Sequence, residues 1–316
     1  MTPASPNMRD PLIVGVDIGG TKTQLRALGP FEEKNQVVPS TEWRMRDWDG
    51  DARKLVSIVR DFVGDAPVAA LGVGAHGCDD AEECALFEDA ISRLCDHPVS
   101  VVNDAELMPY AAGLPGQIGL VAGTGSIAVH RDEDDVMRVA GGWGWVIGDE
   151  GSASGLMRDA VRAVAMHLDD GGDESEPLVA RVLGVLVPPR AARLGSVFSQ
   201  IGRVGEAGKH AHVIFEAADA GSSLAQDVIR CGAEGLADLI RRLERQGAKA
   251  THVVAGGGVI ASQPRLWHGF EKAVADLFGD RITPVLFSGA PVEGACQLAH
   301  DLLGRSHSRS SLIQQY

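Results

Sequence analysis

The chain has few aromatic residues and few positive charges. Aromatics make up 5% of its 316 residues, and 29 lysines and arginines stand against 43 aspartates and glutamates. The resulting net charge of -14 leaves no excess of cations to neutralise phosphates, which argues against nucleic acid or an anionic membrane as partner. No apolar run approaches the ~20 residues that span a bilayer. The start, MTPASPNMRD, lacks the basic and apolar blocks of a signal peptide, so we expect a cytoplasmic protein.

Paired cysteines and the familiar nucleotide motifs are also missing. The five cysteines form no CxxC pair and no Cys/His zinc spacing, which predicts reduced thiols. GEAGKH (205–210) has the wrong spacing for a Walker A loop and no Ser or Thr after its lysine. GVGAHG (72–77) fits the dinucleotide pattern, but the acidic residue that should follow about 20 positions later comes late, at Asp104. A dinucleotide-binding oxidoreductase remains an alternative.

Hydrophobic patterns predict strands that alternate with helices. Residues 12–28 and 118–131 each read as two strands around a Gly/Thr tip, and this similarity suggests an internal duplication. Further strands are expected at 68–77, 99–104 and 251–260, and helices at 51–66, 81–94, 155–168, within 177–220 and at 222–247. The alternation predicts an α/β protein with a largely parallel sheet in each of two lobes around a cleft.

Three glycine-rich tips follow apolar strands: Gly19-Gly20-Thr21, Gly123-Thr124-Gly125-Ser126 and Gly256-Gly257-Gly258. Glycine lets backbone N–H groups approach an oxyanion closely, and Thr and Ser hydroxyls add donors. Lys22 beside the first tip adds positive charge. Each tip alone is compatible with a simple hairpin turn; together they predict phosphate binding.

Carboxylates stand at strand ends. Asp17 before the first tip is a candidate Mg²⁺ ligand or a turn cap. Asp104 ends a strand, as a general base in phosphoryl transfer could, or caps a helix beginning near Glu106. Asp149 and Glu150 precede a helix, where acidic groups favour the helix dipole. That role leaves the glycines and tryptophans of GGWGWVIGDEGSASG (141–155) unexplained.

Together these motifs resemble the actin-like ATPase and sugar-kinase superfamily, in its N-acetylglucosamine kinase branch with the BadF/BadG-type ATPases. VDIGGTKTQLRAL and LVAGTGSIAVHR look like the two phosphate motifs, VVAGGGVI like the adenosine motif, and APVEGACQLA like the closing segment. The run 141–155 is the most specific match. The resemblance implies two actin-like (ribonuclease H-like) lobes, each a mixed sheet flanked by helices, at residues 12–108 and 109–302, between a disordered tail (1–11) and a polar tail (303–316). The second lobe is expected to carry a helical insertion, and its terminal helix could pack back on the first lobe.

The resemblance also implies roles for residues. Asp104 would be the catalytic base and Asp17 the metal ligand, in a reaction that uses ATP and Mg²⁺. The sugar would contact Asn103, Asp104, Asp149 and the glycines Gly141 and Gly142, whose backbone would reach the substrate while the tryptophans pack the loop. The nucleotide would contact the three tips: Gly19, Gly20, Thr21, Lys22, Gly123, Thr124, Gly125, Ser126, Gly256, Gly257 and Gly258. For Glu150 two roles stay open: it supports the sugar site, or it serves as a negative charge at the start of the helix.

The chain departs from this pattern at the sugar side. Ile127 stands where a polar residue usually follows the second tip, and 37–43 lacks a common Asn. Ala75-His76-Gly77 replaces small Ser/Gly residues, so His76 and Gly77 are candidates for an altered pocket. We therefore expect an ATP-dependent kinase acting on an amino hexose, N-acetylglucosamine or glucosamine, at its 6-hydroxyl, and a homodimer. The alternatives are an activator ATPase of the BadF/BadG type, which needs an iron–sulfur cysteine, and a catalytically silent sugar-binding regulator.

Overall fold

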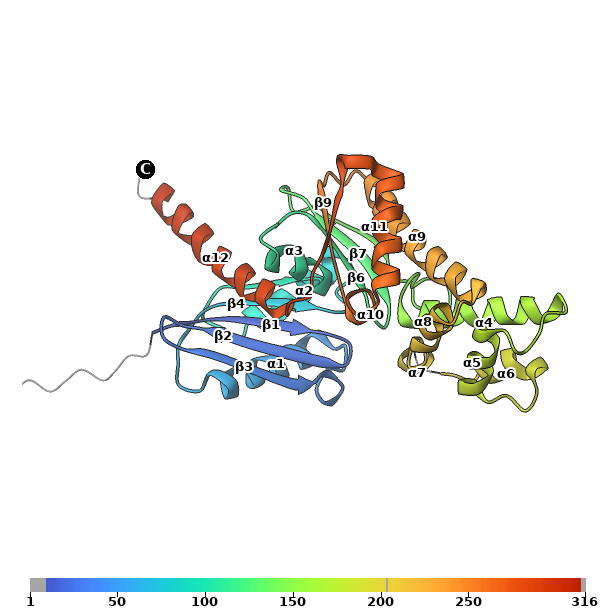
Figure 1. The fold of residues 1–316 in the computed structure, drawn as a ribbon. Helices are drawn as coiled ribbons and strands as arrows, with labels where there is room; N and C mark the ends of the chain where they lie inside the picture. The colour runs from blue at the N-terminus through green and yellow to red at the C-terminus, as the bar shows by residue number, and fades with distance from the viewer. Residues whose placement is uncertain (1–9, 203, 314–316) are drawn as a thin grey trace, which may run out of the picture. The chain divides into compact units, whose positions relative to one another are not determined.

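The computed structural model describes residues 10–202 and 204–313 (Figure 1). Their contacts divide the chain into two compact units. Unit 1 holds the described residues up to Pro115 together with those from Gly289 onward, and unit 2 holds Gly116–Ser288. The expected tails lie outside the description at residues 1–9 and 314–316.

Unit 1 is built on a five-stranded sheet with the order β3-β2-β1-β4-β5. Its strands are β1 (Leu12–Ile18), β2 (Lys22–Leu28), β3 (Glu33–Pro39), β4 (Val68–Ala75) and β5 (Val99–Val102). The first three strands form an antiparallel meander, whereas β1, β4 and β5 run parallel. Most residues of β1 and β4 are buried and the others are half-buried, as expected for central parallel strands.

The helices of unit 1 are α1 (Trp48–Val63), α2 (Ala81–Ser92), α3 (Leu107–Ala111) and α12 (Val292–Ile313). Helix α12 packs on β1 and β4, where glycines allow its backbone to approach closely. A Cβ atom on Gly15 would lie 2.5 Å from the Cys296 nitrogen, and one on Gly72 would lie 2.1 Å from the Ala295 oxygen. Helix α12 continues through the segment expected to be a polar tail, as far as Ile313.

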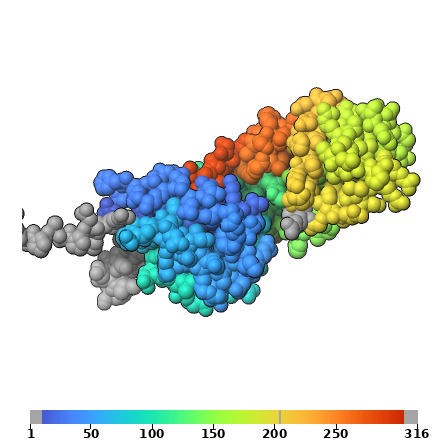
Figure 2. All heavy atoms as spheres, turned by 90° about the horizontal axis from the view of Figure 1, so that it is seen from below, coloured from blue at the N-terminus to red at the C-terminus, as the bar shows by residue number. Residues whose placement is uncertain are grey.

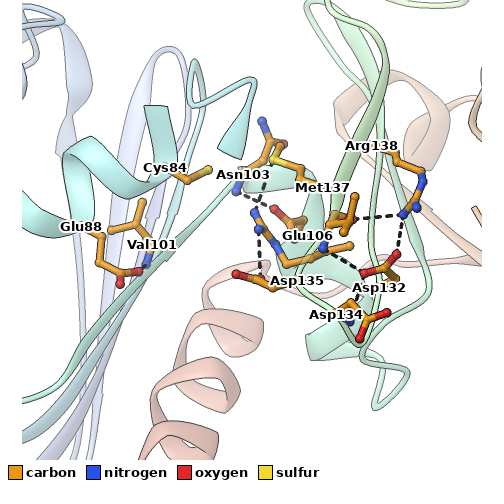
Figure 3. A network of polar contacts seen from close by, with 12 residues as sticks. Cys84, Glu88, Val101, Asn103, Glu106, Asp132, Asp134, Asp135, Met137 and Arg138 are labelled. Carbon is orange, nitrogen blue, oxygen red and sulfur yellow. Dashed lines mark hydrogen bonds and ion pairs between the residues drawn. The ribbon is translucent and has the colours of Figure 1, made fainter. Parts of the chain in front are cut away.

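Unit 2 repeats the same sheet, with the order β10-β9-β6-β7-β8. Its strands are β6 (Ile118–Ala122), β7 (Ser126–Arg131), β8 (Met137–Gly141), β9 (His252–Gly256) and β10 (Thr283–Leu286). Strands β6, β9 and β10 run parallel, and β6, β7 and β8 form the antiparallel meander. Arg138 on β8 closes the β7–β8 turn by pairing with Asp132 at 2.7 Å (Figure 3).

The helices of unit 2 are α4 (Ala153–Asp169), α5 (Pro177–Leu186), α6 (Leu194–Phe198), α7 (Val204–Gly208), α8 (His212–Asp219), α9 (Ser223–Arg245), α10 (Gly258–Ser262) and α11 (Pro264–Phe278). Helices α5 to α8 lie between α4 and α9 in the sequence, and their yellow-green to yellow atoms form a continuous surface in Figure 2. The core of this unit joins the sheet to α4, α8, α9 and α11.

Both predicted hairpins are confirmed, and the shared strand order supports the predicted duplication. The sheets are mixed rather than largely parallel, because each hairpin adds a third antiparallel strand that the hydrophobic pattern did not reveal. Strand β3 was hidden because its residues are mostly exposed and polar. Among the described helices, none is long and apolar enough to span a membrane.

Candidate active site

The carboxyl edge of the unit 1 sheet collects several of the predicted residues. Asp17 lies near the end of β1, His76 follows β4, and Asp104 follows β5. Because these strands are parallel neighbours, their carboxyl ends meet at one edge, where open α/β sheets bind ligands. Nδ1 of His76 lies 3.9 Å from Oδ2 of Asp104.

Asn103, rather than Asp104, caps the short helical turn after β5. Its Oδ1 accepts a hydrogen bond from the Ala105 nitrogen at 2.9 Å. Its backbone nitrogen donates to Oε1 of Glu106 at 3.0 Å (Figure 3). The Asn103 amide also donates to the Cys78 carbonyl at 3.0 Å. Asn103 is thus fully buried and held by its own unit, and Asp104 is left free of the capping role.

Asp104 is a half-buried carboxylate that is incompletely satisfied. Its Oδ1 atom is buried and has no hydrogen-bond partner among the described residues. Burial raises the pKa of Asp104; His76 opposes this effect, and the charge of Asp79 adds to it. Buried polar atoms are normally satisfied, so an orphaned carboxylate oxygen at a ligand-binding edge marks a place for a substrate donor.

Asp17 is also poised for a cation. Burial, with a further contribution from the charge of Asp104, raises the pKa of Asp17 to about 7, although Lys22 acts in the opposite direction. The protein itself therefore supplies too little positive charge near Asp17 and Asp104 to balance both carboxylates. A divalent cation beside Asp17 fits this deficit, since Mg²⁺ is often held by only one or two carboxylates.

The first glycine-rich tip is held at the same edge. The Gly19 nitrogen donates to the Lys22 carbonyl at 3.0 Å and closes the turn between β1 and β2. The Ser40 hydroxyl, from the segment after β3, donates to the Gly19 carbonyl at 2.8 Å. Thr21 and Lys22 are exposed, so their polar groups are available to a ligand.

A pocket of about 120 Å³ lies within unit 1, next to the first tip. It is lined by Gly19, Gly20, Ser40, Thr41, Arg44, Arg46 and His76. The sequence reasoning found the glycines and His76 but missed the two arginines. The available signal was RMR (44–46), two cations two positions apart in an acidic chain, directly after the segment that lacks the expected Asn.

Gly77 lies beneath one of these arginines. A Cβ atom on Gly77 would lie 3.4 Å from Cζ of Arg46, and its φ of +78° favours glycine. Gly77 therefore lets the guanidinium of Arg46 lie close to the backbone after β4. Its predicted place beside a substrate is compatible with this packing role.

In unit 2, the second tip is braced by the acidic run that follows β8. Oδ1 of Asp149 accepts a hydrogen bond from the Ser126 nitrogen at 3.2 Å, and the Ser126 hydroxyl donates to the Glu150 carbonyl at 2.8 Å. The Ser154 hydroxyl donates to the Thr124 carbonyl at 2.7 Å. These contacts place Asp149 directly against the predicted phosphate tip, where Thr124 remains exposed.

The glycines of the run 141–155 have defined conformational roles. Gly141 and Gly142 adopt φ values of +86° and +73°, and the Gly142 nitrogen donates to the Ser126 carbonyl at 2.9 Å. Asp149 itself has a φ of +58°, which is uncommon for a residue other than glycine and is typical of strained functional loops. Ile127 packs against Gly142, at 3.1 Å from the position of a Cβ atom there.

Only one tryptophan of the run packs the loop as expected. Trp145 contacts Phe198 edge-on, with 5.5 Å between ring centroids. Trp143 is 73% exposed, which contradicts the expectation that both rings pack. Arg158 on α4 donates hydrogen bonds to the carbonyls of Trp145 and Gly148. These bonds hold the loop in place, which Trp143 does not.

Glu150 faces helix α9. One of its carboxylate oxygens lies 3.8 Å from Nη2 of Arg242, and a Cβ atom on Gly235 would lie 2.7 Å from its own Cβ. The Glu150 side chain braces the loop against α9 within unit 2.

The third tip lies beside the second. Strands β6 and β9 are parallel neighbours, and a Cβ atom on Gly123 would lie 3.6 Å from the Gly258 nitrogen. Gly257, with a φ of +107°, would place a Cβ atom 2.7 Å from the Ala122 carbonyl. Gly256 ends β9, and α10 begins at Gly258.

The dinucleotide pattern GVGAHG has a packing explanation. Gly72 faces α12, and a Cβ atom on Gly74 would lie 2.3 Å from the side chain of Leu107. Both glycines lie inside β4 and not in a turn that opens a helix. The oxidoreductase alternative loses its sequence basis.

Residues 14–299 match the BadF/BadG/BcrA/BcrD ATPase family. The chain belongs to this family. It is 28% identical over 179 residues to an N-acetylmuramic acid/N-acetylglucosamine kinase of Clostridium acetobutylicum, and 24% identical over 187 residues to an N-acetyl-D-glucosamine kinase of Dictyostelium discoideum. These matches cover 52% and 53% of this chain and 56% and 58% of the relatives.

Solved structures share the fold. A protein from Chromobacterium violaceum, described as a proposed N-acetylglucosamine kinase, superimposes with a TM-score of 0.65 and 22% identity over 92% of this chain and 99% of that chain. A ROK family glucokinase from Streptomyces griseus does so with a TM-score of 0.54 and 19% identity, over the same shares of the two chains. The predicted fold class, two mixed sheets with flanking helices of the actin-like kind, is confirmed.

Proposed function

We propose that this protein is an ATP-dependent sugar kinase, and that it transfers the γ-phosphoryl group to a hydroxyl of an amino hexose, at the 6-position of an N-acetylglucosamine-type or glucosamine-type sugar. Family membership and the names of the two curated relatives support the reaction class. The observation that carries the proposal is the buried and unpartnered Oδ1 of Asp104 at the ligand-binding edge of the unit 1 sheet.

Asp104 would act as the general base. Its free oxygen can accept a hydrogen bond from the acceptor hydroxyl and then take its proton as the phosphoryl group is transferred. Burial makes this carboxylate more basic than an exposed aspartate, which brings its pKa closer to the operating pH. His76, 3.9 Å from Asp104, is placed to limit that effect.

The remaining predicted residues divide between nucleotide and sugar. Asp17 would hold Mg²⁺, which supplies positive charge to the phosphates when it is bound. The tip of unit 1, with Thr21 and Lys22, and the tip of unit 2, with Thr124, would bind phosphate oxygens through exposed polar groups. Gly256, Gly257 and Gly258 would border adenosine. Asp149, with Gly141 and Gly142, would bind sugar hydroxyls.

ADP release tests the proposal. The purified protein with Mg²⁺-ATP and a panel of neutral hexoses and amino hexoses should release ADP in a sugar-dependent manner. Asp104→Asn should lower kcat by ~10²–10⁴, because it removes the proton acceptor. Asp65→Asn is the matched control, since Asp65 is an exposed carboxylate of the same unit.

Two results would contradict the proposal. A protein that releases no ADP above background with any sugar is not a sugar kinase of this specificity. ADP release that is independent of sugar would instead support the activator ATPase alternative. An Asp104→Asn rate within about tenfold of the wild type would remove Asp104 from the role of base.

A further inference from the structure

The pocket beside the first tip of unit 1 contains a buried cation whose hydrogen-bond donors the protein leaves unpaired. The side chain of Arg44 is only 8% exposed. Its three guanidinium nitrogens are buried without a hydrogen-bond partner among the described residues. The charge is balanced in part by an ion pair with Asp51, at 3.8 Å from Nε, and by the ring of Phe87, whose centroid lies 5.9 Å from Cζ. A buried guanidinium is costly unless its donors are paired, so this side chain calls for an anionic ligand.

The turn that carries Arg44 is fixed by a buried carboxylate. Asp51 of α1 is fully buried, and its two oxygens accept hydrogen bonds from the nitrogens of Met45 at 2.8 Å and Arg46 at 3.0 Å. Arg46 is held with a φ of +59°, an uncommon conformation for this residue. A strained backbone that is held by a buried acid is typical of a functional site.

The same turn is connected to the first tip. The Ser40 hydroxyl donates to the Gly19 carbonyl at 2.8 Å and also bonds Oγ1 of Thr23 at 2.8 Å. The Arg44 nitrogen donates to the Ser40 carbonyl at 2.9 Å. Arg44 and Arg46 therefore line one preformed pocket, which also contains His76, 3.9 Å from the proposed base.

The size and donors of the pocket indicate what it binds. Two guanidinium groups in one small pocket match the oxygens of a carboxylate or a phosphate, because each can donate in a planar fork. At about 120 Å³ the pocket is smaller than the ~300–1,000 Å³ of a site for a whole ligand, so it fits one substituent of a larger molecule.

We propose that this pocket is an oxyanion subsite of the acceptor site, in which Arg44 and Arg46 bind a carboxylate carried by the sugar. The acceptors of this enzyme then include an acidic amino hexose, not only neutral ones. The inference rests on the proposed kinase function. A nucleotide phosphate is the other source of such an oxyanion; His76 and the neighbouring Asp104 favour the acceptor, because the base must contact the sugar hydroxyl.

A matched set of sugars tests this assignment. N-acetylglucosamine and N-acetylmuramic acid differ by a lactyl ether that carries a carboxylate, and the methyl ester of N-acetylmuramic acid keeps the bulk without the charge. We expect kcat/KM for the acid to exceed that for the ester at least about tenfold, as the loss of a charge-assisted hydrogen bond implies. Arg46→Gln should reduce this preference about tenfold or more, and Arg53→Gln, an exposed arginine on α1, should leave it unchanged.

Arg44→Lys tests the buried cation without removing its charge. It should also weaken the preference, because a lysine cannot donate two parallel hydrogen bonds. Melting temperatures of the variants show whether a loss of preference comes with unfolding. If Arg44→Lys does not fold, Arg46→Gln alone decides the question, since Arg46 lies at the pocket rim beside Gly77.

Equilibrium binding without nucleotide separates this inference from the proposed function. N-acetylmuramic acid should bind the wild type more tightly than its methyl ester, and Arg46→Gln should remove the difference, even if no sugar yields ADP. Equal binding of acid and ester would overturn the subsite. If Arg46→Gln instead raises the KM for ATP with every sugar and keeps the preference for the acid over the ester, the pocket binds a nucleotide phosphate and the subsite is overturned.

Discussion

Asp17 shows how one residue can set the response of the protein to pH. Its pKa is raised from 3.8 to about 7, first by burial and then by the charge of Asp104. Between those pH values the folded protein binds a proton at Asp17 that the unfolded chain releases. The contribution of Asp17 to the stability of the metal-free protein is therefore highest below about pH 4 and falls as the pH rises to about 7.

Asp17→Asn should therefore flatten this dependence. In EDTA, the melting temperature of the wild type should fall between pH 5 and pH 8 by at least about 2 °C more than that of Asp17→Asn, because the amide carries no charge to be repelled by Asp104. Asp65→Asn, which changes an exposed carboxylate, should behave like the wild type. Parallel curves for wild type and Asp17→Asn would show that this carboxylate is already ionised in the folded protein at pH 5.

At the residue scale, the sequence was informative where a functional side chain stands at the end of an apolar strand. Asp17 and Asp104 were predicted because each stands at the end of an apolar strand, and His76 because it departs from the family pattern. Parallel pairing of the strands then brings the three residues to one edge of the sheet. Arg44 and Arg46 were missed because their turn follows an exposed edge strand with no hydrophobic pattern. Asp51 was missed as well, because nothing in a sequence shows that a helical aspartate turns back to hold the preceding loop.

At the scale of elements, the run 149–155 joins the second tip to the start of α4. The Ser152 hydroxyl donates to the Asp149 carbonyl at 2.8 Å and accepts from the Gly155 nitrogen at 3.1 Å, as an N-cap does. The Ala153 nitrogen donates to the Gly123 carbonyl at 2.9 Å. Ser152 thus begins the helix that the sequence predicted, and Ser154 holds the second tip through the Thr124 carbonyl, which the sequence did not reveal.

This double role makes Gly155 sensitive to a single methyl group. A Cβ atom there would lie 2.0 Å from the Asp149 carbonyl, so Gly155→Ala should lower the free energy of unfolding by about 1–3 kcal/mol through overpacking. Gly184→Ala is the opposite case, since a Cβ atom at this exposed position of α5 has no neighbour within 4 Å. It should stabilise by roughly 0.5–1 kcal/mol through helix propensity.

Urea unfolding followed by tryptophan fluorescence measures both effects. Trp145, in the loop that Arg158 holds, reports on the same region. Similar midpoints for Gly155→Ala and the wild type would mean that the loop moves aside for the methyl group. The fixed contact between the Asp149 carbonyl and the helix start would then not brace the second tip.

At the scale of the whole chain, the duplication explains which parts of the fold were predictable. The same hairpin motif appears twice in the sequence, about a hundred residues apart, once in each unit. Both sheets also have the same strand order. That the terminal helix packs on the first lobe was expected from the family resemblance alone, because the contacts of α12 with β1 and β4 depend on small residues far apart in the sequence. Gly15 and Gly72 look like ordinary strand glycines until a helix is placed against them.

The two units also have separate cores, which predicts separate responses to mutation. The large core cluster of unit 2 draws only on residues between Ile118 and Ile282, whereas Leu107 and Ala295 belong to a cluster of unit 1. Gly72→Ala should push α12 away from the sheet, because a Cβ atom there would lie 2.1 Å from the Ala295 carbonyl. Hydrogen exchange should then accelerate in β1, β4 and α12, with β6 and β9 remaining as protected as in the wild type.

Gly155→Ala is the reciprocal variant, because its overpacking falls in unit 2 and should accelerate exchange around α4 and the second tip. Peptide-level hydrogen exchange under native conditions measures both variants against the wild type. Faster exchange of both sheets in both variants would show that the units unfold as one. Confined changes would mean that a substitution at the Asp104 edge can be judged for its effect on catalysis without a parallel loss of structure around Asp149, which is what the kinase experiments require.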